Sequence, residues 1–219
     1  MKILTITRSI YRMYCAGGIQ RIWHEIDNYF FDILNKTDTY TRRPLETYDK
    51  DTPYIESAFE YMPSYTQTIK TSLNKIIKKD DNVLKSNFLD IGCGKGKIML
   101  IASTLGFKTG VGFEINKNLS IIAEKNLIIK KIENKYKIIN ENAVNKNIIP
   151  EFSVCYFYNP FNKTMSQKFF NILEEKKTKI NKYLIYVNPL FSKFLNDNWD
   201  LIDKFNVGTQ DVQIWKYKN

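Results

Sequence analysis

Residues 88–97 read Phe88-Leu89-Asp90-Ile91-Gly92-Cys93-Gly94-Lys95-Gly96-Lys97, an apolar run that ends in an aspartate and three glycines at alternate positions. Glycine reaches the positive φ angles of a tight turn at little cost, and without a Cβ it lets a ligand approach the backbone. The apolar run is typical of a buried strand, and the residues after the turn fit a helix start, which offers free N–H groups. We therefore expect a strand, a ligand-binding turn and a helix here.

Apolar runs and amphipathic stretches alternate on both sides of this turn. Pro63 and Ser64 supply helix-start signals ahead of the first amphipathic stretch. Alternation of strands and helices predicts a parallel sheet with helices on both faces, and two tandem runs at the end of the sequence predict an antiparallel edge hairpin. We expect strands at 87–91, 109–113, 136–140, 152–158, 183–187, 201–207 and 212–217, and helices at 66–79, 97–105, 118–129 and 164–176.

The first 45 residues differ from this alternating pattern. Apolar residues recur at roughly helical spacing over residues 10–26, with a break expected at Gly17-Gly18, and residues 35–43 are polar and predict a loop. The sequence therefore divides into a helical N-terminal extension, residues 1–45, which we expect to act in substrate recognition or as a lid, and a ligand-binding domain, residues 46–219.

Composition narrows the class of protein. The chain has 219 residues, 43% hydrophobic, and a formal net charge of +10 that comes mostly from lysine. This charge fits a nucleic-acid surface or, with more weight, a compositional bias toward Lys, Asn and Ile. Three widely spaced cysteines and a single histidine predict no zinc site, no disulfide framework and no bound metal. With no apolar run of about 20 residues, we expect a cytoplasmic protein without a membrane span.

Two acidic residues indicate the kind of ligand. In the dinucleotide fingerprint the third glycine comes one place later than Gly96 does here. Asp90 would repel a pyrophosphate, but its carboxylate suits the ammonium group of an amino acid. Glu114 ends the next predicted strand, where a carboxylate can accept from both hydroxyls of a ribose. The pattern favours a nucleoside that carries a cationic amino-acid end and no phosphate.

Residues 90–96 resemble motif I of the class I S-adenosylmethionine-dependent methyltransferases, and Glu114 resembles their ribose-binding acid. The resemblance covers roughly residues 55–219. It implies a Rossmann-like, seven-stranded, mostly parallel sheet with an antiparallel C-terminal hairpin. It also implies S-adenosyl-L-methionine as the cofactor and S-adenosyl-L-homocysteine as the product. The cofactor-binding residues that it implies are Tyr61, Asp90, Gly92, Cys93, Gly94, Gly96, Glu114, Ile115, Asn142, Ala143 and Asn159.

Some of these matches are less complete. Ile115 occupies the position that packs on adenine in the family, and Tyr61 lies in a segment that closes over the methionine end. Asn142 stands where the family usually has an acid that accepts from the adenine amino group, and an amide oxygen can accept that bond too. The segment Thr37-Asp38-Thr39 resembles an Asp-Thr segment that precedes the core in such proteins.

The segment Asn159-Pro160-Phe161 follows the fourth predicted core strand and contains the expected catalytic residues. It resembles the N-P-P-[YF] motif of methyltransferases that act on nitrogen, and, with Tyr158, the Tyr-Asn-Pro-Phe segment of a broader set of bacterial methyltransferases. The second proline of the N-P-P-[YF] motif is missing here, which shifts the aromatic residue relative to Asn159. The same residues also fit an Asn-Pro turn after a buried strand.

The methyl acceptor cannot be read from these motifs. We favour a small molecule or a protein side chain, with nitrogen as one option for the accepting atom. RNA or DNA is the alternative acceptor, and a non-catalytic binding module is the alternative function. An NAD enzyme fits less well because the third glycine comes early. His24, the single histidine, lies in the extension and fits a structural role.

Overall fold

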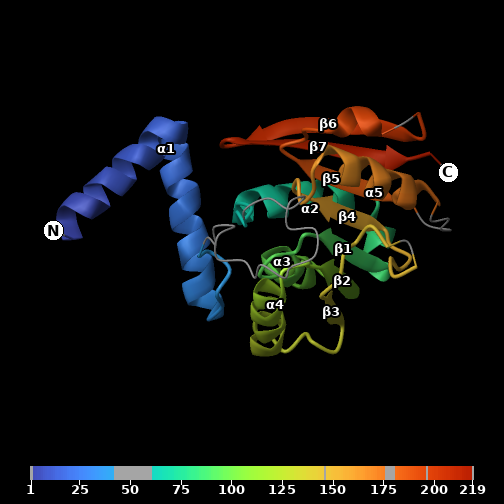
Figure 1. Ribbon diagram of the computed structural model, residues 1–219, viewed down its shortest axis with the longest axis horizontal. Helices are drawn as coiled ribbons and strands as arrows, with labels where there is room; N and C mark the ends of the chain where they lie inside the picture. Colours follow the sequence, from blue (N-terminus) through green and yellow to red (C-terminus); the bar gives the residue numbers. More distant parts are fainter. Residues whose placement is uncertain (1, 42–60, 146, 176–180, 196, 219) are drawn as a thin grey trace.

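The computed structural model describes residues 2–41, 61–145, 147–175, 181–195 and 197–218. Within them, one seven-stranded sheet has the order β3-β2-β1-β4-β5-β7-β6 (Figure 1). Strand β7 runs antiparallel to both β5 and β6, and the other neighbouring pairs are parallel. The strands are β1 (Asn87–Ile91), β2 (Thr109–Phe113), β3 (Tyr136–Ile139), β4 (Val154–Phe157), β5 (Tyr183–Val187), β6 (Trp199–Val207) and β7 (Gln210–Tyr217). The predicted fold, a mostly parallel sheet with a C-terminal antiparallel hairpin, is confirmed.

Helices cover both faces of the sheet, as predicted. Neighbouring residues of a strand point to opposite faces, so Tyr156 of β4 joins one core cluster and Phe157 joins the other. Helices α2, α3 and α4 contribute to the first cluster and α5 to the second. The bounds are α2 (Thr66–Lys79), α3 (Lys97–Thr104), α4 (Lys117–Ile129) and α5 (Lys163–Glu175), with short 3-10 helices η3 (Asp81–Lys85) and η4 (Ser192–Phe194).

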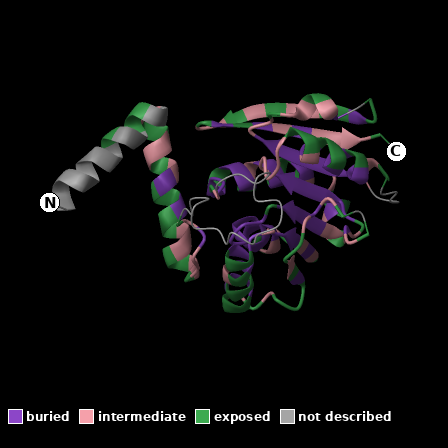
Figure 2. Ribbon diagram, viewed as in Figure 1, coloured by how far each residue is buried: buried purple, intermediate pink, exposed green. Residues whose placement is uncertain are grey.

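The central strands are buried because helices lie on both of their faces. Every residue of β4 and β5 is buried, and Figure 2 shows these strands in the purple of buried residues. Such strands are apolar along their whole length instead of alternating. The carboxyl ends of β1, β2 and β4 meet at one edge of this rigid layer, and the residues that follow them are held in place by it.

The N-terminal extension forms one long helix, α1 (Lys2–Asn35), in place of the two helical pieces that we expected. Gly18 has a φ of +65°, outside the helical range, and Figure 1 shows α1 bent into two arms. The bend lies where the break was predicted, although the helix continues through it. The predicted domain boundary at residues 45 and 46 lies outside the described residues.

Helix α1 packs against the rest of the chain through buried polar side chains and through Phe31, which lies on the core. Glu25 and Asn28 are buried, whereas Trp23 and Phe30 are 64% and 53% exposed. This orientation reverses the usual arrangement of an amphipathic helix. Asn28 is buried because it meets two polar groups there, the N-terminus of α2 and the Nζ of Lys97.

Helix α2 begins at Thr66, as predicted, but the residue that caps it differs from the prediction. The residue that precedes the helix is Tyr65, and its side chain makes no capping bond. The side chain of Ser64 instead accepts a hydrogen bond from the Tyr156 hydroxyl, at 3.2 Å. Asn28 of α1 caps the helix, since its Oδ1 accepts from the backbone N–H of Thr66 at 3.3 Å.

No described helix combines the length and the hydrophobicity that a membrane span requires.

Candidate active site

A cavity of about 360 Å³ lies at the carboxyl ends of the central strands. Open α/β sheets bind ligands at this edge, next to the point at which the order of the strands reverses. The contributing segments lie at the ends of β1 to β5, at the starts of α3 and α4, and ahead of α2. The lining residues are Tyr61–Ser64, Asp90–Cys93, Lys97, Ile98, Phe113–Ile115, Leu119, Glu141–Ala143, Tyr158–Phe161, Asn188 and Leu190.

The glycine turn takes the conformation that its sequence requires. Gly92 and Gly94 have φ angles of +71° and +52°, which other residues rarely adopt. A Cβ on Gly92 would lie 2.5 Å from a side-chain carbon of Pro160, and one on Gly94 would lie 2.1 Å from the ring of Tyr61. The turn is therefore in direct contact with two other predicted site residues. Gly96, with a φ of +80°, directly precedes α3.

Asp90 is a buried carboxylate that lacks a hydrogen-bond partner among the described residues. It is 1% exposed, and both of its carboxylate oxygens are unpaired. Burial, and secondarily the nearby Glu114, raises the pKa of Asp90 well above its usual range. Buried charges in proteins are normally paired. The side chain lines the cavity, so a cationic group bound there would supply the missing partner.

Glu114 lies across the same cavity, and the backbone fixes its direction. Its Oε2 accepts from the N–H of Gly94 and its Oε1 from the N–H of Asn116, both at 2.8 Å. Burial raises the pKa of Glu114 to about 7, and the backbone hydrogen bonds offset part of that rise. A carboxylate oxygen has two lone pairs. Each oxygen can therefore still accept a hydroxyl group of a ligand.

The residues predicted to surround the nucleoside line the same cavity. Ile115, Asn142 and Ala143 belong to its wall. The Oδ1 of Asn142 accepts from the backbone N–H of Val144 at 3.0 Å, so this oxygen already holds the turn after β3. Sequence reasoning missed Asn140, whose Nδ2 donates to the carbonyls of Glu114 and Ile115 and ties the end of β2 to that turn.

Cys93 and Tyr61 complete the predicted cofactor set. Cys93 is buried, and a Cβ on the neighbouring Gly112 would lie 2.9 Å from its sulfur. Burial raises the pKa of the Cys93 thiol, which keeps it neutral. The ring of Tyr61 lies over Gly94, and the Tyr61 hydroxyl donates to the carbonyl of Thr39 at 2.7 Å. The N-terminal extension therefore reaches the edge of the cavity.

The segment after β4 is a strained turn whose side chains face the cavity. Asn159 has a φ of +40°, and its Nδ2 donates to the backbone carbonyl of Asn188. Its Oδ1 is buried and has no partner among the described residues. Pro160 packs against Gly92. The ring of Phe161 lies 5.8 Å from that of Phe157, so Phe161 is partly a core residue as well as a wall of the cavity.

Two lysines beside Gly96 were given no role by the sequence. Lys97 lines the cavity, and its Nζ donates to Asn28 of α1 and to the carbonyl of Ser64. Burial lowers the pKa of Lys97 to about 7. Lys95 is fully buried and pairs with Asp38. The sequence signal for both residues is a glycine at a helix start with a lysine on each side of it. Sequence reasoning did not use this pattern.

His24 lies away from this cavity. Its ring stacks on that of Tyr65, with the centroids 4.4 Å apart, and its edge meets Gly208 in the β6–β7 hairpin. The expected structural role of His24 agrees with these contacts. Within the described ranges, His, Cys, Asp and Glu side chains form no group of three that could hold a metal ion.

No protein-family model matches the sequence, and a search of curated proteins found no match. The fold is similar to many solved structures. An RNA methyltransferase from Salinibacter ruber in complex with S-adenosyl-L-homocysteine is 19% identical, with a TM-score of 0.57 over 72% of this chain and 95% of that chain. A ribosomal protein L11 methylase from Lactobacillus delbrueckii subsp. bulgaricus is 15% identical, with a TM-score of 0.59 over 75% and 83%. The chain therefore has the Rossmann-like fold of the class I methyltransferases.

The raised pKa of Glu114 predicts how stability depends on pH. The folded state holds the proton up to about pH 7, whereas the unfolded chain releases it near the ordinary value of about 4.3. Because the unfolded state then binds fewer protons, the free energy of unfolding falls as pH rises between these values and levels off above pH 7. The loss amounts to about 4 kcal/mol from this group.

Urea unfolding of the unchanged chain and of Glu114→Gln at several pH values between 4 and 8 measures this effect. The difference between the two proteins isolates Glu114 from the other titrating groups. We expect the unchanged chain to lose more stability over this range than the variant. Parallel pH profiles would show that Glu114 ionises normally in the folded protein.

Proposed function

We propose that this chain is an S-adenosyl-L-methionine-dependent methyltransferase that acts on a nitrogen of a small molecule or a protein side chain. The observation that carries the proposal is the unpaired, buried carboxylate of Asp90 at the glycine turn of a methyltransferase fold. A buried carboxylate without a partner is costly, and a ligand with an ammonium group relieves that cost. The RNA methyltransferase from Salinibacter ruber, solved with S-adenosyl-L-homocysteine, supports the choice of cofactor.

The residues around the cavity fit this cofactor. Asp90 would accept from the ammonium group, and Glu114 from the ribose hydroxyls. Gly92 and Gly94 would contribute by shaping the tight turn, because a Cβ at either position would lie within 2.5 Å of Pro160 or Tyr61. Ile115 would pack on the adenine, with Asn142 and Ala143 beside it and Tyr61 closing over the methionine end. Cys93 and Gly96 would contribute through the shape of the turn.

When bound, S-adenosyl-L-methionine supplies an electrophilic methyl group on a positively charged sulfur. The task of the chain is then to align an acceptor with that group and to exclude water. Asn159 is suited to the alignment because its Nδ2 is fixed on Asn188 while its Oδ1 stays free. An amide oxygen held in this way accepts an N–H and directs the lone pair of that nitrogen. Pro160 and Phe161 form the adjoining wall.

Nitrogen fits these groups better than a carboxylate or thiol acceptor does. The free oxygen of Asn159 requires a hydrogen-bond donor, and a primary amine or amide provides one together with the attacking atom. A neutral amine needs no general base before it attacks. The partial match of Asn159-Pro160-Phe161 to the N-P-P-[YF] motif of methyltransferases that act on nitrogen supports the same assignment.

RNA is the second candidate acceptor. The formal net charge of +10 favours association with a polyanion, and one structural neighbour is an RNA methyltransferase. Binding to RNA through lysines would weaken steeply with added salt. A methylated product of low molecular weight, formed equally well at high salt, would favour the small-molecule acceptor instead.

Cofactor binding is tested by calorimetry with S-adenosyl-L-homocysteine and with NAD. We expect S-adenosyl-L-homocysteine to bind the unchanged chain, no binding of NAD, and a loss of at least tenfold in affinity, about 1.4 kcal/mol, in Asp90→Asn. Asp200→Asn, which alters the exposed ion pair between Asp200 and Lys218, is the matched control and should bind normally. Equal affinity in Asp90→Asn, or a preference for NAD, would exclude the proposed site.

The role of Asn159 is tested with Asn159→Gly and Asn159→Asp. Glycine tolerates the positive φ of this position, so Asn159→Gly removes the amide without straining the turn, and Asn159→Asp keeps an acceptor oxygen. We expect both variants to bind S-adenosyl-L-homocysteine normally. Transfer of labelled methyl from S-adenosyl-L-methionine into extract of the source cells should fall about 100-fold in Asn159→Gly and less in Asn159→Asp. Full transfer by Asn159→Gly would remove Asn159 from the mechanism.

A further inference from the structure

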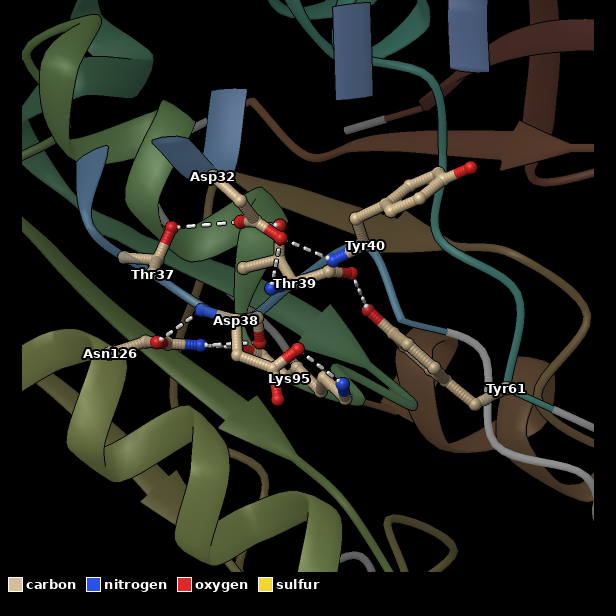
Figure 3. Close-up of polar contacts among 8 residues, drawn as sticks. All are labelled: Asp32, Thr37, Asp38, Thr39, Tyr40, Tyr61, Lys95 and Asn126. Carbon is tan, nitrogen blue, oxygen red and sulfur yellow. Dashed lines mark hydrogen bonds and ion pairs between the residues drawn. The ribbon is translucent and has the colours of Figure 1, made fainter. Parts of the chain in front are cut away.

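The end of the N-terminal extension is built around one carboxylate. Asp32, in the last turn of α1, accepts four hydrogen bonds of 2.6–2.9 Å (Figure 3). The donors are the hydroxyls of Thr37 and Thr39 and the backbone N–H groups of Thr39 and Tyr40. We call residues 37–40 the strap. Asp32 fixes the backbone of the strap, and the Thr39 side chain is fully buried. The strap therefore has a defined shape at the end of α1.

The strap is bonded to the glycine turn. Asp38 Oδ1 lies 2.6 Å from the Nζ of Lys95, which is the residue between Gly94 and Gly96. The Lys95 side chain is 0% exposed, whereas that of Asp38 is 47% exposed. A buried ammonium group needs such a partner, since removal of one member of a buried pair leaves an uncompensated charge. Asp38 therefore neutralises a charge inside the turn itself.

Asn126 of α4 joins the same two segments through their backbones. Its Oδ1 accepts from the N–H of Asp38 at 3.1 Å. Its Nδ2 donates to the carbonyls of Asp38 at 3.0 Å and Lys95 at 2.9 Å. All three contacts are drawn in Figure 3. Asn126 therefore holds the backbones of Asp38 and Lys95 side by side, so the two side chains of the ion pair are not free to move apart.

A further contact connects the strap to the wall of the cavity. The Thr39 carbonyl accepts from the hydroxyl of Tyr61, at 2.7 Å, and the Tyr61 ring covers Gly94. Burial raises the pKa of Tyr61 well above its usual range, so the hydroxyl keeps its proton and remains a donor. Two consecutive strap residues therefore hold two consecutive residues of the glycine turn. Asp38 holds Lys95 through the ion pair, and Thr39 holds Tyr61, whose ring covers Gly94.

We propose that Asp38 is a positioning residue for cofactor binding, which acts by holding the glycine turn through Lys95, and that cofactor binding in return stabilises the strap. The inference rests on the proposed function and extends it to the N-terminal segment. Asp38 is not among the residues that line the cavity, so its effect passes through Lys95, with which it pairs. By thermodynamic linkage, a strap that strengthens cofactor binding must itself be strengthened by the cofactor to the same degree.

The affinity for S-adenosyl-L-homocysteine, measured by calorimetry, tests the first half. We expect Asp38→Asn and Lys95→Met each to weaken binding about tenfold, and the double variant to bind no more weakly than the weaker single variant, because both changes break one interaction. The matched control is Asp203→Asn, which breaks the exposed 2.8 Å pair between Lys75 and Asp203. It should bind within twofold of the unchanged chain. Folded single variants that bind within twofold would overturn the proposal.

Hydrogen exchange in the unchanged chain tests the second half without any substitution. The amides of Thr39 and Tyr40, which donate to Asp32, should exchange at least five times more slowly when S-adenosyl-L-homocysteine saturates the protein. Equal exchange with and without the ligand would overturn the proposal even if the variants fail to fold. If the unchanged chain does not bind S-adenosyl-L-homocysteine, the proposed function falls and this inference falls with it. If it binds normally and only the strap experiments fail, the role of Asp38 alone is rejected.

Discussion

Two acidic side chains, Asp90 and Glu114, line the same buried cavity. Among the described residues, neither of them is paired with a lysine or arginine side chain. Asp90 lies on β1 and Glu114 directly follows the neighbouring strand β2, and burial raises the pKa of both. An arrangement of this kind lowers the stability of the empty protein and favours a ligand that brings positive charge and hydroxyl groups. The parallel sheet, the glycine turn and the helices that bury the cavity all serve to keep these two acids close together and away from water.

The neighbouring cations are directed elsewhere. Lys95 and Lys97 flank Gly96 in the same turn, yet their ammonium groups bind Asp38 and Asn28 of the N-terminal segment. If either lysine instead reached Asp90, it would neutralise the carboxylate that we expect to bind the cofactor. The extension therefore provides polar partners for both lysines, including Lys97, which itself lines the cavity.

Much of the fold follows from local sequence. The run from Phe88 to Gly96 specified a strand, a turn and a helix, and alternation of apolar stretches specified the sheet around it. The positions of Asp90 on β1 and of Glu114 directly after β2 placed both acids in one cavity. These features depend on residues close together in sequence, or on the rule that parallel strands end at the same edge.

Other features depend on contacts between distant segments. Ser64 looked like a helix cap, but the cap of α2 is Asn28, 38 residues earlier. The apolar residues of α1 indicated a helix but not what it contacts, and the helix meets the domain through Asn28, which bonds Thr66 and Lys97, and through Phe31, which packs on the core. The bond between Asp38 and Lys95 spans 57 residues and carries no local pattern.

The role of the two buried acids is measured by the number of protons that the protein releases when it binds S-adenosyl-L-homocysteine. Titration calorimetry at neutral pH in two buffers with different ionisation enthalpies gives this number. If burial keeps a proton on the acids of the empty cavity and the ligand's ammonium group requires a carboxylate, binding must release that proton. We predict proton release in the unchanged chain and a smaller release in a chain that lacks the Asp90 carboxylate. Absence of binding, or the same proton count in both proteins, would contradict the central claim.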